Sequence, residues 1–157
     1  MTQETERQRW QRNFVELLQE LRVVQTGVQI LFAFLLILAY TPGFASVDRF
    51  ALVVYLVALL SAAAAAALII APVAHHRMLF RRGQKPRLVR YASRMTFAGL
   101  MLVMVSMVSV VLLATDALVP RTVAITLAAV TGLIFVTLWG VMPVLHRRAI
   151  GAAEPDA

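Results

Sequence analysis

The sequence predicts an all-α protein, a four-helix transmembrane bundle with cytoplasmic helical extensions. Of its 157 residues, 61% are hydrophobic, compared with about 45–50% apolar residues in average globular domains. The apolar residues form four nearly charge-free runs, each as long as the roughly 20 residues that an α-helix needs to cross hydrocarbon. None of these runs has the polar face of a helix at the surface of a soluble protein. Four membrane spans are therefore expected.

The expected elements divide the chain into three parts. Residues 1–22 form an amphipathic cytoplasmic helix continuous with the first span, residues 23–149 form the bundle, and residues 150–157 form a disordered tail. Within the bundle, a basic cytoplasmic hairpin is expected at 72–94. The four spans are expected at about 23–41, 50–71, 95–115 and 122–145.

The first helix is predicted to run from about residue 6 to residue 40, which is roughly 50 Å at 1.5 Å per residue. Its cytoplasmic half has an apolar face with helical spacing, made by Trp10, Phe14, Leu17, Leu18 and Leu21. Two arrangements of this half are open. It bends and lies flat among the lipid head groups, or it continues straight and packs on the cytoplasmic ends of the second and third helices.

Two short loops are expected on the outer side. In TPGFASVDR (41–49), Pro42 and Gly43 end the first helix and Asp48 begins the second. In DALVPR (116–121), Pro120 begins the fourth helix, and Asp116 is assigned to the start of the loop. The outer side therefore offers little surface for a ligand.

The inner hairpin is expected to extend two helices beyond the membrane. Helix can continue past Pro72 through HHRMLFRR, end at Gly83 and begin again with Pro86 in the first turn. Lys and Arg number thirteen in the N-terminal segment, this hairpin and the C-terminal tail, and two in the outer loops. By the positive-inside rule, the protein is multi-pass in the plasma (inner) membrane, with both termini cytoplasmic.

The leading functional hypothesis is a non-enzymatic membrane protein that acts through this basic cytoplasmic collar. Anionic lipid head groups or a protein partner are the expected ligands, because the positive charges flank two spans; nucleic acid is not expected. The predicted binding residues are Arg77, Arg81, Arg82, Lys85, Arg87, Arg90 and Arg94.

The alternative hypothesis is a small transporter or channel subunit. Gln25 and Gln29 are four residues apart in the first span, and Arg22 continues their line toward the cytoplasm. This polar stripe either lines a pathway for protons, cations or a small solute, or makes hydrogen bonds between helices. The pathway reading calls for a homo-oligomer or a membrane protein partner, since four helices enclose little space. The spans hold no central acidic or basic residue, which argues against coupled proton or sodium transport.

Other residues predict structure rather than chemistry. The chain has no cysteine and no catalytic or metal-ligand spacing, so neither an enzyme nor a cofactor is expected. The run SAAAAAALIIA (61–71) predicts a closely packed second helix. Gly140 and Pro143 predict a kink near the cytoplasmic end of the fourth helix.

Two stretches of the chain resemble a known family. ELLQELRVVQTGVQILFAFLL (16–36), ALIIAPVAHHRMLFRRGQK (67–85) and the pair Leu138–Trp139 are similar to an uncharacterised family of small bacterial four-helix integral membrane proteins. The resemblance covers residues 8–148. It implies an integral membrane protein of unknown function, with no catalytic or binding residues to transfer.

Overall fold

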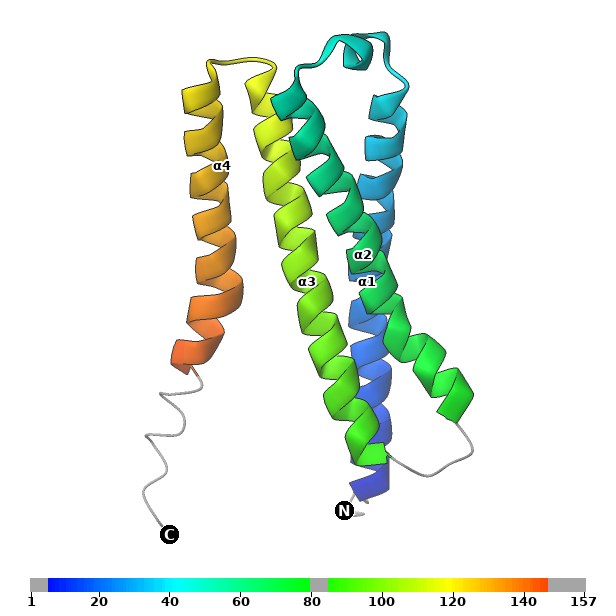
Figure 1. The fold of residues 1–157 in the computed structure, drawn as a ribbon. Coiled ribbons are helices and arrows are strands. Elements are labelled where there is room, and N and C mark those ends of the chain that lie inside the picture. Colours follow the sequence, from blue (N-terminus) through cyan, green and yellow to red (C-terminus); the bar gives the residue numbers. More distant parts are fainter. Residues whose placement is uncertain (1–5, 80–84, 147–157) are drawn as a thin grey trace. The chain divides into compact units, whose positions relative to one another are not determined.

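A computed structural model of the protein describes residues 6–79 and 85–146 (Figure 1). Side chains are described for Arg12, Gln19, residues 21–72, Ala74 and residues 94–146. In the described residues the chain is helical and has no strand. Four long helices follow one another in chain order, from α1 in blue to α4 in orange. The predicted all-α fold with four helices is confirmed.

The four helices match the four apolar runs of the sequence. Their bounds are Glu6–Ala39 for α1, Arg49–Leu79 for α2, Lys85–Asp116 for α3 and Arg121–Val136 for α4. A π-helical turn, η2, follows α4 directly, and α-helix then continues to residue 146. Each helix contains a stretch that is long and apolar enough to cross a membrane. These candidate spans are Leu21–Ala39, Arg49–Pro72, Arg94–Asp116 and Arg121–His146.

The first helix is continuous, as the sequence predicts. α1 has 34 residues without a break, which corresponds to about 50 Å. Among the described side chains of α1, the buried ones are Leu21, Val28 and Leu35. Because they are seven residues apart, they lie on one face of the helix.

The loop between α1 and α2 contains a short 3-10 helix, η1, at Pro42–Ser46. It ends before Asp48, whose Oδ1 accepts a hydrogen bond from the backbone N–H of Ala51 at 2.9 Å. The backbone carbonyl of Asp48 also accepts a bond from Leu52, at 3.0 Å. Both are the bonds of an N-cap residue, which confirms the predicted start of α2.

Pro72 lies inside α2 and does not end it. The helix continues for seven residues to Leu79, as expected from the sequence. Proline costs an interior helix one backbone hydrogen bond. Pro72 is buried, so neighbouring side chains hold this part of the helix in place.

The chain forms two compact units. The first comprises Met1–Ser46 and Leu59–Val103, so it contains α1, the second part of α2 and the first part of α3. At its centre, α2 and α3 approach closely beside Gly99. A Cβ atom at Gly99 would lie 2.8 Å from Ile69 Cγ1 and 3.4 Å from the Ala65 carbonyl oxygen. Ala62 and Ala65 are fully buried, so small residues on α2 and a glycine on α3 allow this approach.

The second unit comprises Val47–Ala58 and Met104–Ala157. Here the Ser106 hydroxyl of α3 is fully buried and donates to the Ala58 carbonyl of α2 at 2.8 Å. α4 lies close to α3 at Gly132, where a Cβ atom would be 3.7 Å from Val108 Cγ2. The buried residues of α4 are also small and spaced by four, Ala124 and Ala128.

The distortion predicted near Gly140 and Pro143 takes the form of a π-helical turn, η2, at Thr137–Val141. The N–H of Met142 bonds to the carbonyl of Thr137, five residues earlier. Pro143 has no N–H for the carbonyl of Trp139, and its ring would clash with that carbonyl in a regular α-helix. A wider turn just before the proline relieves this clash.

Candidate functional site

The predicted lipid-binding residues all fall in residues 77–94, here called the basic segment. This segment includes the end of α2 and the beginning of α3. The α2 helix ends at Leu79 and α3 begins at Lys85. The side chain of Arg94 is exposed at the first residue of the third candidate span. The other six side chains lie outside the described ones, namely Arg77, Arg81, Arg82, Lys85, Arg87 and Arg90.

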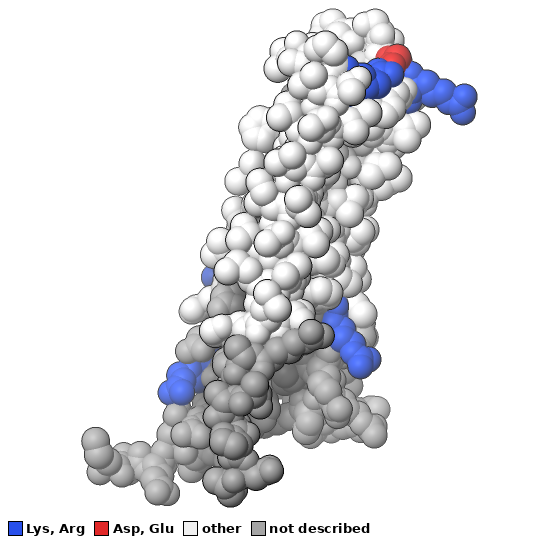
Figure 2. All heavy atoms as spheres, turned by 90° about the vertical axis from the view of Figure 1, so that its left-hand side faces the viewer, with Lys and Arg blue, Asp and Glu red and all other residues white. Residues whose placement is uncertain are grey.

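The basic segment holds the entire net charge of the protein. In residues 1–22 four arginines are balanced by four glutamates. The α1–α2 and α3–α4 loops, residues 41–49 and 116–121, each have one arginine and one aspartate, and residues 147–157 have two charges of each sign. Residues 77–94 contain seven Lys and Arg and no Asp or Glu, which accounts for the net charge of +7. On the face shown in Figure 2, the described charged side chains are few and most of the described surface is uncharged.

The three residues of the predicted polar stripe have different environments. Arg22 and Gln29 are exposed, whereas Gln25 is partly buried. No hydrogen bond joins either glutamine side chain to another of the described residues. Gln29 therefore does not line the interior of the described structure, and a pathway along it would need a further chain to enclose it.

Most hydroxyl groups of the candidate spans are bonded to their own helix. Ser109, Thr115, Thr126, Thr131 and Thr137 each donate to the backbone carbonyl four residues earlier. Such bonds satisfy the hydroxyl without a partner helix. They use the single donor of each hydroxyl and leave only its oxygen as an acceptor.

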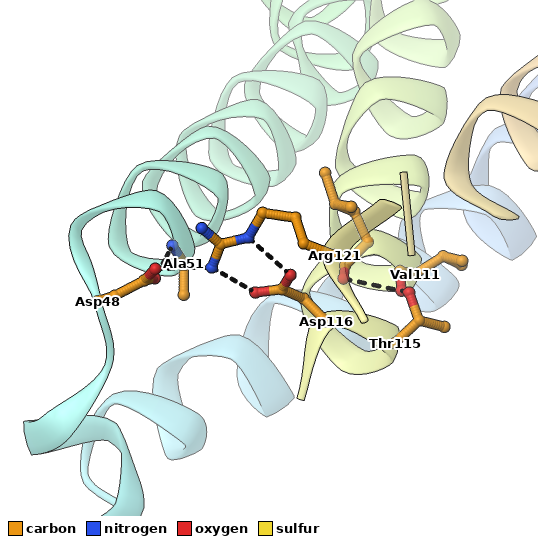
Figure 3. Close-up of polar contacts among 7 residues, drawn as sticks. Asp48, Ala51, Val111, Thr115, Asp116 and Arg121 are labelled. Atoms are coloured by element: carbon orange, nitrogen blue, oxygen red, sulfur yellow. Dashed lines mark hydrogen bonds and ion pairs between the residues drawn. The ribbon is translucent and has the colours of Figure 1, made fainter. Parts of the chain in front are cut away.

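An ionic cluster at the α3–α4 loop of the second unit is the best-defined polar arrangement of the described residues (Figure 3). Arg121, the first residue of α4, donates from Nε and Nη2 to both carboxylate oxygens of Asp116, at 3.0 and 3.2 Å. Its Nη2 also donates to Asp48 Oδ2 at 2.6 Å. The guanidinium carbon lies 4.2 Å from the ring centroid of Phe50, in a cation–π contact.

This cluster connects the start of α2 with both ends of the loop between α3 and α4. The Asp116 side chain is only 10% exposed and that of Asp48 is 52% exposed. The backbone hydrogen bond from Ala51 and the hydrogen bond from Arg121 hold the pKa of Asp48 below its ordinary value of 3.8. The cluster has the geometry of a clamp between loop ends, since each of its three charged side chains bonds to at least one of the others.

Arg121→Ala is expected to lower the midpoint of thermal unfolding in detergent more than Arg49→Ala does. Arg121 bonds two carboxylates, whereas no hydrogen bond or ion pair joins Arg49 to another described residue. The pKa of Asp48 is lowered in the folded protein, so its contribution is fully present above pH 3.8 and is lost as the pH falls through the folded value. The difference between wild type and Arg121→Ala should therefore shrink below that pH. Equal losses for the two variants at neutral pH would contradict the clamp.

Sequence reasoning identified Asp48 as a helix start and Asp116 as a loop start, but it did not pair them through Arg121. Asp48 and Arg121 are 73 residues apart. The available signal was that both outer loops contain one Asp and one Arg. Among the described side chains, no three His, Asp or Glu residues lie close enough to hold a metal ion.

Comparison with known proteins places the chain in a family. No curated protein and no solved structure matches it. Residues 3–143 match a family of unknown function, DUF6328. The match covers all four helices up to the π-helical turn, which confirms the resemblance to an uncharacterised family. The chain therefore belongs to the family of unknown function DUF6328.

Proposed function

We propose that the protein is a non-enzymatic, multi-pass protein of the plasma (inner) membrane that binds anionic lipid head groups through its basic segment. The observation that supports this function is the concentration of the whole net charge of +7 in residues 77–94, between two candidate spans. An anionic leaflet attracts each juxtamembrane Lys or Arg by about 1 kcal/mol. Seven such residues, with no acidic residue among them, attract anionic lipid head groups strongly.

The proposed orientation follows from the same charges. Both termini and the basic segment are cytoplasmic, since the positive-inside rule counts Lys and Arg near the ends of spans. The outer loops then contain the balanced pairs Asp48–Arg49 and Asp116–Arg121. A protein partner with an acidic surface is the competing ligand for the basic segment.

Replacing Arg81, Arg82, Lys85 and Arg87 by glutamine is expected to weaken a preference for anionic lipid strongly. The wild-type protein in mixed micelles of phosphatidylglycerol and phosphatidylcholine should retain the anionic lipid selectively, as counted by native mass spectrometry. At about 1 kcal/mol per charge, removing four charges weakens the attraction by up to about 4 kcal/mol. Because each 1.4 kcal/mol is a factor of ten, the preference of the four-residue variant for the anionic lipid should fall by at least about tenfold.

Two Arg–Arg pairs provide a matched control. Arg81–Arg82 belongs to the basic segment, whereas Arg147–Arg148 shares its tail with two acidic residues. Glutamine at the first pair should reduce phosphatidylglycerol retention more than glutamine at the second. Equal retention of both lipids by the wild-type protein, or equal effects of the two pairs, would overturn the proposed function. In that case an acidic protein partner becomes the ligand to seek by cross-linking.

A further inference from the structure

The side-chain amide of Gln29 is exposed in the middle of the first candidate span. The span runs from Leu21 to Ala39, so Gln29 is far from both of its ends. The side chain is exposed, and no hydrogen bond joins its amide to another described residue. A primary amide offers two N–H donors and a carbonyl acceptor. Hydrocarbon satisfies none of these groups, so an amide at this depth is stabilised by a partner from outside the described contacts.

Gln29 lies in a line of small or polar residues along α1. Thr26, Gln29 and Ala33, here called the Gln29 stripe, are all exposed and have the spacing of one helical face. The Thr26 hydroxyl is already bonded to the Arg22 carbonyl at 3.0 Å, so the unsatisfied group of the stripe is the Gln29 amide. The buried residues Leu21, Val28 and Leu35 mark a different face.

We propose that the Gln29 stripe is the contact surface for α1 of a second copy of this chain. Two copies inserted in the same orientation place Gln29 at the same depth, and a two-fold axis puts each residue opposite itself. An amide is self-complementary, since each copy can donate one hydrogen bond and accept another. The short side chains of Thr26 and Ala33 allow the two helices to approach closely. Arg22, at the cytoplasmic end of the same face, reaches the head groups with its long side chain.

This inference depends on insertion of α1 into the membrane and is independent of lipid binding by the basic segment. Dimerisation through the Gln29 stripe and lipid binding by the basic segment can therefore be disproved independently of each other. Dimerisation persists in the variant with glutamine at Arg81, Arg82, Lys85 and Arg87 if the Gln29 stripe alone carries it. Loss of the dimer in that variant would assign association to the basic segment and overturn the proposal.

The absence of cysteine from the sequence allows a direct test by single-cysteine cross-linking in reconstituted vesicles. Ala33→Cys keeps Gln29 and adds a thiol to the stripe. Phe34→Cys is the matched control, because Phe34 is 67% exposed at the same depth but lies about 100° further around the helix. Oxidation should give a covalent dimer of Ala33→Cys and little dimer of Phe34→Cys, since a disulfide needs Cα atoms within about 7 Å.

The amide is tested in the Ala33→Cys background. Adding Gln29→Leu should abolish the covalent dimer, and adding Gln29→Asn, which keeps the amide, should retain it. A purified Ala33→Cys protein that stays monomeric would overturn the proposal in favour of a different partner. Equal cross-linking of Ala33→Cys and Phe34→Cys, or a dimer unaffected by Gln29→Leu, would also overturn it.

Discussion

Ala65→Leu is expected to destabilise the protein by about 1–3 kcal/mol or more, the usual cost of overpacking a close-packed site. Ala65 has no exposed surface, and its carbonyl oxygen would lie 3.4 Å from a Cβ atom at Gly99. A leucine side chain has no space there without displacing the residues packed around Ala65. The free energy of unfolding can be measured by titrating the detergent-solubilised protein with dodecyl sulfate and following helicity.

Ala64→Leu is the matched control for this prediction. The two alanines are neighbours in a run of six identical residues, 62–67, but Ala64 is exposed. Exposed substitutions usually change stability by no more than about 0.5 kcal/mol. Equal destabilisation by leucine at both positions would show that Ala64 is packed as tightly as Ala65, which contradicts the exposure of Ala64 in the structure.

Gly99→Ala is expected to destabilise the protein, whereas Gly132→Ala is expected to be neutral or stabilising. Both glycines are in helices, where alanine is favoured by about 1 kcal/mol. At Gly99 the added Cβ would meet Ile69 Cγ1 at 2.8 Å, but at Gly132 it would lie 3.7 Å from Val108 Cγ2, an ordinary contact. Overpacking of about 1–3 kcal/mol therefore outweighs the helix gain at Gly99 alone.

The cause of the Gly99 effect can be isolated with a double-mutant cycle. Ile69→Ala removes the atom that the new Cβ would meet. Gly99→Ala should therefore cost less in the Ile69→Ala background than in the wild type, because residues in contact are not additive. The same unfolding titration measures all four proteins. If Gly99→Ala lowers the free energy of unfolding equally in both backgrounds, the strain does not arise from contact with Ile69.

The number and the positions of the helices were predictable because each helix depends on the residues within it. The four apolar runs predict four helices that could cross a membrane, and the structure has them. Pro72 was expected to stay inside its helix, and it does. The Asp48 cap was also predictable, since a cap depends on a few adjacent residues.

Contacts between helices were not predictable for two physical reasons. Six identical alanines have no periodic pattern, so the sequence does not distinguish buried Ala65 from exposed Ala64. The bond from Arg121 to Asp48 depends on how chain segments 73 residues apart come together.

The form of the distortion near Gly140 and Pro143 was not predictable either, because a kink and a π-helical turn have the same local signal in the sequence. The predicted lipid-binding residues other than Arg94 lie outside the described side chains.

The π-helical turn at Thr137–Val141 also sets which way the last turn of the helix faces. A π-helical turn accommodates one more residue than an α-helical turn, and each α-helical residue advances about 100° around the axis. Every residue after Val141 is therefore set back by one position. His146 points in the direction that Leu145 would take in an uninterrupted helix. Converting this turn to regular α-helix with the same number of residues would thus rotate the end of the helix by about 100°. Deleting one residue from the turn would instead remove the extra residue and leave the following side chains in their present directions.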